Sequence, residues 1–253
     1  MNQLRAELLK IRSTRTSIGL LAGLVVIALL FSILTGTLSP KVGLVTPQDQ
    51  LSLLSFGSIA GVFAALAGIM LFTSEYRFGT IRPTFLFSPS RDRLMATKVA
   101  AGAISGLAFG VIGEGLVFGL SVMIMHLRGV ALALSGSAVT QLLIGAVVGS
   151  ALWGVIGVAL GSIVANQVGA VISLLAWGFV VENLVFGLLP KIGRFLPIHA
   201  ADAMMGRIQP SMLAGDVGAV VVVVVRSAPL RILPRALRGH VLQYLFRVHA
   251  LAP

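Results

Sequence analysis

The chain has 253 residues, a mean hydropathy of +1.01 and only 11% charged residues, whereas soluble globular domains carry roughly twice that share of charge. Its net charge of +11 does not indicate a nucleic-acid-binding protein, because the basic residues cluster at the ends of apolar runs. The absence of cysteine excludes disulfides, thiolate metal sites and cysteine nucleophiles. The composition therefore predicts an integral membrane protein with membrane lipid, and no nucleic acid, among its partners.

Residues 1–16 predict an amphipathic helix, with Leu4, Leu8 and Ile11 on one face and most of the basic residues elsewhere. We expect this helix to lie in the membrane interface, with its apolar face in lipid and its cations near anionic headgroups. A short solvated lead-in to the first span is the alternative. The segment is too charged and too long for a signal peptide, so we expect residue Ser17 to begin a retained membrane anchor.

Five apolar runs follow, each long enough to cross a bilayer, which takes about 20 helical residues. They do not alternate as the strands of a membrane barrel would, so they predict helices and an all-α fold. The runs cover residues 17–38, 51–74, 99–125, 142–165 and 168–189.

Lysine and arginine are densest in residues 1–16, which hold four, and in residues 75–98, which hold five. By the positive-inside rule this distribution places the N-terminus in the cytoplasm. Arginine outnumbers lysine, and alanine, valine and glycine are abundant, as in proteins from GC-rich bacterial genomes. We therefore expect a multi-pass protein of the bacterial inner membrane.

Glycines recur at four-residue spacing inside these runs, a pattern that lets membrane helices approach closely. Packing within the chain explains most of them, and a face for a second copy is expected among them. They are Gly57 and Gly61, Gly102, Gly106 and Gly110, Gly115 and Gly119, and Gly145 and Gly149.

A sixth span over residues 212–230 is marginal. Residues 217–225 are apolar, but Arg226 follows at once, so a crossing requires Asp216 and Arg226 to snorkel at its two ends. We expect this marginal span to cross and to place the basic tail, residues 231–253, in the cytoplasm. An altered reading frame near the end of the apolar run is one hypothesis for the tail, and genomic resequencing tests it.

The charged segment 75–98 between the second and third spans is longer than a simple hairpin requires. Gly79 is suited to end the preceding helix, and Thr80 to cap a short new helix with Ile81 on its apolar side. Such a helix can lie on the membrane surface and insert into a groove on a soluble partner. A solvated hairpin that obeys the positive-inside rule is the alternative.

At this segment the chain resembles a known family. The run Gly-Ile-Met-Leu-Phe-Thr-Ser-Glu-Tyr-Arg, ending at Arg77, is followed by Phe-Gly-Thr-Ile-Arg and later by Lys98 at the start of the next span. This pattern, and the Glu-Leu-Leu-Lys-Ile-Arg-Ser-Thr-Arg run near the N-terminus, resembles the membrane subunit of type-2, exporter-like ABC transporters. The likeness covers residues 1 to about 213.

The resemblance implies a six-span permease that dimerises and docks on two cytoplasmic ATP-binding subunits. Residues 1–16 would form the interfacial elbow, and the outer loop 190–213 would hold small external helices. The early Arg226 departs from the long apolar final span of that family. The loop after the second span would couple the permease to its ATPase through Glu75, Tyr76, Arg77, Gly79, Thr80, Ile81 and Arg82.

The phosphate-binding motif GxxxxGK[ST] is absent, so we expect ATP hydrolysis on a separate chain and no enzyme activity in this one. His126 and His199 are isolated, and no spacing supports a metal site. We therefore expect neither a metal nor a cofactor.

Two carboxylates, Glu114 and Glu182, lie inside predicted spans. A charge at bilayer depth is costly, so such residues often mark transport paths or proton relays. The alternative is a protonated or hydrogen-bonded carboxyl that ties helices together, and Asn183 stands next to Glu182. An alternative function is therefore a proton-coupled secondary transporter that uses both carboxylates, although no repeat relates the two halves of the chain.

Overall fold

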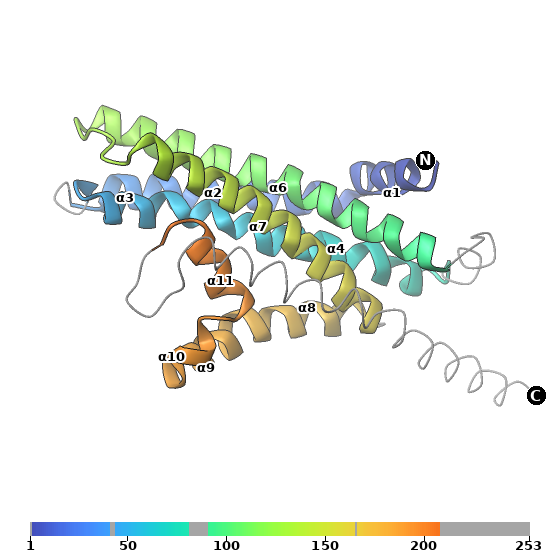
Figure 1. The fold of residues 1–253 in the computed structure, drawn as a ribbon. Coiled ribbons are helices and arrows are strands. Elements are labelled where there is room, and N and C mark those ends of the chain that lie inside the picture. The colour runs from blue at the N-terminus through green and yellow to red at the C-terminus, as the bar shows by residue number, and fades with distance from the viewer. Residues whose placement is uncertain (1, 41–43, 81–90, 165, 208–253) are drawn as a thin grey trace, which may run out of the picture.

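The computed structural model describes residues 2–40, 44–80, 91–164 and 166–207, and every regular element in these ranges is helical (Figure 1). Within these ranges, five helical units are long and apolar enough to cross a membrane. The predicted all-α fold is confirmed for the described residues, and the length and composition of the five units agree with a multi-pass membrane protein. The predicted sixth span 212–230 and the tail 231–253 lie outside them.

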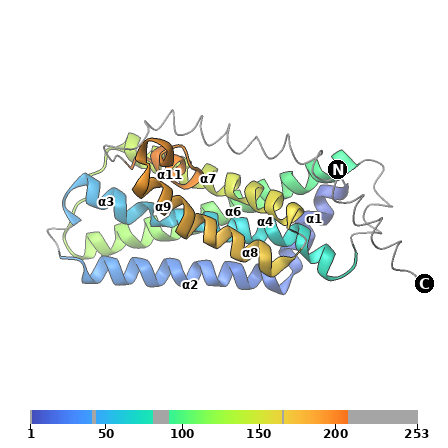
Figure 2. The same cartoon turned by 90° about the horizontal axis from the view of Figure 1, so that it is seen from below.

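The first helix, α1 (Asn2–Ser13), precedes the five units and lies at one end of the molecule, called here the α1 end (Figures 1 and 2). The units are α2 (Arg15–Leu38); α3 (Pro47–Leu54) with the 3₁₀ segment η2 (Ser55–Ile59) and α4 (Ala60–Arg77); α6 (Arg91–Leu127); α7 (Gly136–Ile163); and α8 (Gln167–Leu175) with the π-helical segment η3 (Ala176–Val181) and α9 (Glu182–Leu188). Two short helices, α10 (Pro190–Gly193) and α11 (Pro197–Met204), occupy part of the predicted outer loop.

The helices extend past the apolar runs because polar residues cap them outside the runs. Thr46 accepts a hydrogen bond from the backbone N–H of Asp49 at the start of α3, and Ser135 accepts one from Ala138 at the start of α7. Parts of the charged segment 75–98, which was expected to be a loop, therefore belong to helices. Its first residues end α4 and its last eight begin α6.

Two units are interrupted. The segment η2 contains serines around Gly57, and η3 contains Gly178. Glycine and serine are common at helix kinks, and 3₁₀ and π segments inside long helices often mark hinges or functional sites. Each interruption lies next to one of the two intramembrane carboxylates, Glu114 and Glu182, whose environments are described below.

The units of α4 and α7 form the centre of the bundle. In the most apolar stretch of each, 61% of the residues are buried, against 17% in α2 and in the fifth unit. A Cβ atom placed on Gly68 or Gly157 would collide with the backbone of the facing helix. These glycines, and the Gly102–Gly106–Gly110 series of α6 facing α7, therefore serve packing within the chain.

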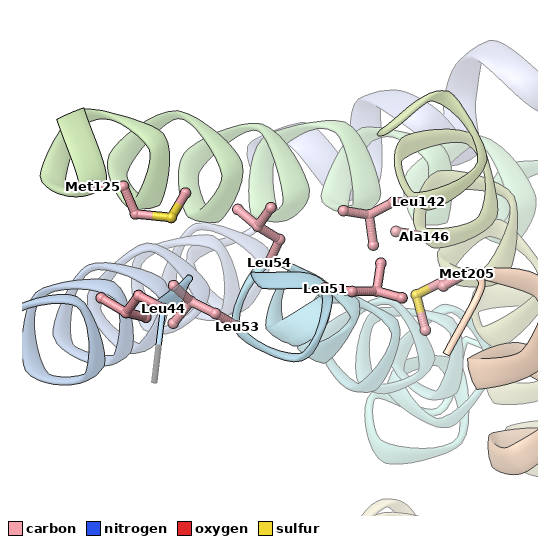
Figure 3. Packing of buried hydrophobic residues seen from close by; sticks show 8 residues of the cluster. All are labelled: Leu44, Leu51, Leu53, Leu54, Met125, Leu142, Ala146 and Met205. Carbon is pink, nitrogen blue, oxygen red and sulfur yellow. The ribbon is translucent and has the colours of Figure 1, made fainter. Parts of the chain in front are cut away.

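At the end of the molecule opposite α1, eight apolar residues close the core. Figure 3 shows them between α3, the end of α6, the start of α7 and the residue after α11. The cluster consists of Leu44, Leu51, Leu53, Leu54, Met125, Leu142, Ala146 and Met205.

The amphipathic N-terminal helix packs differently from the expectation. Leu4, Leu8 and Ile11 contact a buried cluster that includes Phe72 of α4 and Met95 of α6. The apolar face thus lies on protein rather than in lipid as predicted. The physical reason is that α4, α6 and α7 together form an apolar cluster at this end of the bundle, and the apolar face of α1 packs against it.

Candidate functional site

A buried group of charged side chains joins three helices at the α1 end. Lys98 of α6 is fully buried, and its ammonium donates hydrogen bonds to Glu7 Oε1 of α1 at 2.9 Å, to Glu75 Oε1 of α4 at 2.6 Å and to the carbonyl oxygen of Leu71 at 3.0 Å. An ammonium has three N–H donors, so Lys98 uses all of them.

Lys10 completes this ionic cluster of Glu7, Lys10, Glu75 and Lys98. Its ammonium lies 3.1 Å from Glu75 Oε1, and about a third of its side chain is exposed. The ring of Phe72 lies 5.3 Å from the Lys98 ammonium. Two carboxylates and two ammonium groups balance in charge, which reduces the cost of burying them.

The ionic cluster holds together both helices that flank residues 78–90. Glu75 lies near the end of α4 and Lys98 in the second turn of α6, while Glu7 attaches α1 to both. Removing one member of a buried ion pair typically costs about 3–5 kcal/mol, because the other charge stays buried without compensation. The cluster therefore makes these three helix ends one mechanical unit.

The predicted coupling residues divide into buried and exposed groups. Glu75 is 4% exposed and belongs to the ionic cluster, and Tyr76 packs against the apolar cluster around Phe72. Arg77 and Thr80 are exposed, as is Gly79, whose φ of +68° ends α4 in the left-handed conformation predicted for it. Ile81 and Arg82 lie outside the described residues.

A groove of about 340 Å³ lies beside these exposed residues. It is bordered by the end of α4, by the junction of α1 and α2 and by the first residue of α8. Lys10, Thr14, Arg77, Thr80 and Gln167 contribute polar side chains to its wall. The rest of the wall is mostly apolar, so the groove is an apolar concavity at the α1 end with basic and polar side chains in its wall.

The sequence analysis missed Glu7 and Lys10 as members of this site. The sequence does contain a signal for Glu7, because Glu7 falls on the same helical face as Leu4, Leu8 and Ile11. A carboxylate inside an apolar stripe indicates a buried partner. Its partner, however, is 91 residues away in the chain and is identified only by the packing.

Glu182 is completely buried and hydrogen-bonded. Its Oε1 accepts from the indole N–H of Trp177 at 2.9 Å, and its Oε2 accepts from the backbone N–H of Ile198 at 2.8 Å. Ile198 stands in the first turn of α11, so the carboxylate ties α11 to the fifth unit. This geometry agrees with the structural alternative considered for Glu182.

Glu114 has a different environment. It is 1% exposed, and neither carboxylate oxygen has a hydrogen-bond partner among the described residues. Its side chain fills the space in front of Gly57 in η2, where a Cβ atom would collide with it. The helices α2 beyond Arg15, η2 and α7 carry no titratable side chain. A buried carboxyl in such surroundings is costly unless it is neutralised.

Within the part of the chain that the structure describes, no three His, Asp or Glu residues group as metal ligands. His199 instead stacks on Phe186, with ring centroids 4.0 Å apart.

No protein-family model and no curated protein matches this chain. The resemblance of the 68–98 segment to exporter permeases therefore stays a prediction from the residues themselves.

Proposed function

We propose that the chain is the membrane-spanning permease subunit of an ATP-driven ABC exporter, in which a separate cytoplasmic subunit hydrolyses ATP. One structural observation carries the proposal beyond the motif: the ionic cluster centred on Lys98 locks α1, α4 and α6 together around residues 78–90. A coupling loop can pass a movement of the ATP-binding subunit to the bundle only if the helices on both sides of the loop move with it.

In the proposed mechanism, closure of the ATP-binding subunits displaces residues 78–90, and α1, the end of α4 and the start of α6 follow as one body. The close glycine contacts of α4 and α6 with α7 pass this displacement to the centre of the bundle. Access to a path between two protomers then changes, as in rigid-body switching. Glu75 and Lys98 join the two helices that flank this segment, whereas Arg77 and Thr80 are exposed.

The groove of about 340 Å³ beside Arg77 and Thr80 supports the docking part of this proposal. Its exposed basic side chain, Arg77, favours an acidic residue on the ATP-binding subunit. The N-terminus is cytoplasmic in this arrangement, and the inner membrane is the expected location.

The test is a detergent pull-down of tagged protein followed by identification of bound ATPases. Wild type should recover a P-loop ATPase, and Arg77→Glu should lose it, since the exposed side chain lies at the proposed docking rim. Lys191→Glu is the matched control, because Lys191 is exposed on α10, away from the α1 end (Figure 1). Folded, membrane-inserted wild type that recovers no ATPase contradicts the proposal.

Proton-coupled transport is the second candidate. The observation that favours it is the buried Glu114, which has no hydrogen-bond partner in the part of the chain that the structure describes. Transport by the purified chain in vesicles should then follow a proton gradient, and Glu114→Gln should abolish it.

Modification by a hydrophobic carbodiimide, which reacts with protonated carboxyls, gives a second test. Glu114 should be labelled, while Glu182, held by two hydrogen bonds, serves as the control within the same chain. Absence of labelling at Glu114 across neutral pH contradicts a protonation role.

A further inference from the structure

A cavity of about 210 Å³ lies between the second, fourth and fifth helical units and α11. Both interrupted segments contribute to it, η2 through Phe56 and η3 through Phe179. Most of the remaining wall is apolar, with Ile59, Trp153 and Leu174 among its residues. The cavity does not include the ionic cluster, Glu114 or Glu182.

The size and lining of the cavity suit an apolar group. An apolar cavity of about 150 Å³ in another protein stays dry and accepts benzene, so this larger cavity has room for a hydrocarbon segment. Glycines create part of the space: a Cβ atom built on Gly149 meets nothing within 4 Å. Water is a poor occupant of the apolar part of the cavity because it needs two to four polar partners.

One rim of the cavity is ionic. Asp202 of α11 and Arg207 both line it, with 3.3 Å between a carboxylate oxygen and a guanidinium nitrogen. Burial raises the pKa of Asp202, against the opposing effect of Arg207. The rim thus presents one cation and one anion side by side, which complements a group that also carries both charges.

The cavity is also polarised along its length. Gly206, next to Arg207, lies beside Gln141 in the second turn of α7, whereas Trp153 stands about three turns further along the same helix. The charged end is therefore near the end of a spanning helix, and the aromatic wall is towards its middle. A phospholipid has the same order, with its headgroup at the interface and its chain towards the bilayer centre.

We propose that this cavity binds a segment of one acyl chain of a zwitterionic phospholipid, with the phosphate towards Arg207 and the ammonium towards Asp202. The lipid places hydrocarbon between η2 and η3 and so supports the two interrupted helices. This lipid-binding proposal does not depend on the proposed ATPase partner, so either proposal can be wrong while the other holds.

The chain's own tryptophans provide the measurement. It has two, so Trp177→Phe leaves Trp153 as the single fluorophore in the cavity wall. Brominated phosphatidylethanolamine, added to the protein in bilayer discs of unbrominated lipid, should quench Trp153 saturably at a low mole fraction. Unbrominated phosphatidylethanolamine should restore the fluorescence by competition.

Two leucine substitutions separate the cavity from general lipid contact. Gly149→Leu adds a side chain to the cavity wall at a position where a Cβ atom meets nothing within 4 Å, and it should remove the saturable quenching, leaving only the linear part from surrounding lipid. Gly119→Leu is the matched control, because Gly119 also has open space in front of it but lies on α6 outside the cavity. Thermal melting checks that both variants fold. If Trp177→Phe is unstable, the same comparison is made in protein that retains Trp177.

The preference for a zwitterionic headgroup is tested by changing the lipid headgroup and by substituting Asp202. Brominated phosphatidylglycerol, which is anionic, should quench Trp153 at least several-fold less effectively at equal fraction, and Asp202→Asn should reduce the preference. Equal quenching by both lipids overturns the zwitterionic assignment. Purely linear quenching in wild type, or saturable quenching that survives Gly149→Leu, overturns the cavity as the lipid site.

Discussion

Two lysines at the α1 end illustrate how burial changes the contribution of a charged side chain to stability. Lys98 and Lys10 both bind Glu75 Oε1, at 2.6 and 3.1 Å. Lys98 is fully buried, while about a third of the Lys10 side chain is exposed. Water can replace the partner of an exposed cation but not that of a buried one, so two contacts to the same carboxylate oxygen can contribute very different energies.

Replacement of each lysine by methionine tests this difference. Lys98→Met should lower the free energy of unfolding by about 3–5 kcal/mol, since it leaves Glu7 buried without a cation and Glu75 with only the partly exposed Lys10. Lys10→Met should cost less than about 1 kcal/mol, as for exposed pairs. Thermal unfolding in detergent, followed by circular dichroism, measures both. Equal melting of Lys98→Met and wild type would show that the ionic cluster does not stabilise the fold.

His199 supplies a pH-dependent prediction outside the spanning helices. The residue is 7% exposed on α11, and burial lowers its pKa below the ordinary 6.5, with Arg207 adding a smaller effect in the same direction and Asp202 opposing it. The unfolded chain therefore takes up a proton at higher pH than the folded chain does. Unfolding free energy should fall as the pH drops through about 6.5 and below.

The measurement is denaturation between pH 7.5 and 5.5, compared for wild type and His199→Phe. The difference between the two isolates the histidine from Asp202, whose own pKa is raised by burial. The variant should lose the acid-side decrease. An identical pH profile in both proteins contradicts the assignment.

Between elements, the contacts of α7 depend on glycine. A Cβ atom on Gly157 would collide with the carbonyl oxygen of Ala65 in α4, and one on Gly106 would collide with that of Ser150. In lipid there is no hydrophobic drive to bring helices together, so close backbone approach supplies dispersion contacts instead. The spacing in the sequence predicted such packing but not which glycines carry it.

A pair of leucine substitutions distinguishes packing glycines from free ones. Gly157→Leu should destabilise by roughly 1–3 kcal/mol or more through overpacking. Gly115→Leu should change stability by less than about 1 kcal/mol, because nothing lies within 4 Å of its Cβ position. Retention of monodisperse protein after heating reports the difference. Similar losses in both variants would refute the assignment of Gly157 to the α4–α7 interface.

Considered as a whole, the molecule has a buried centre and two exposed flanks. The units α2 and α8 to α9 keep large apolar side chains such as Leu30 and Leu184 on the outside, 63% and 58% exposed. Such surfaces are unfavourable in water and suit lipid or a second membrane subunit. The exposed apolar flanks and the five helical units of spanning length therefore both indicate a multi-pass membrane protein.

Its orientation is open to a direct test because the chain has no native cysteine. Ser13→Cys places a thiol at the α1 end, and Ser137→Cys places one at the opposite end of the bundle; both positions are exposed. A membrane-impermeant maleimide applied to intact cells should label position 137 and not position 13. The reverse pattern would overturn the cytoplasmic N-terminus.

The sequence by itself determined the helical, membrane-spanning character, because span length and apolar content are local properties. Local chemistry also predicted that Gly79 ends α4. The tertiary structure alone decided that Lys98 binds both Glu7 and Glu75, and that Glu182 meets α11 while Glu114 has no hydrogen-bond partner among the described residues. It also decided that a cavity opens between η2 and η3. These features depend on which side chains from distant parts of the chain come within a few ångströms, and hydrophobic periodicity carries no information about that.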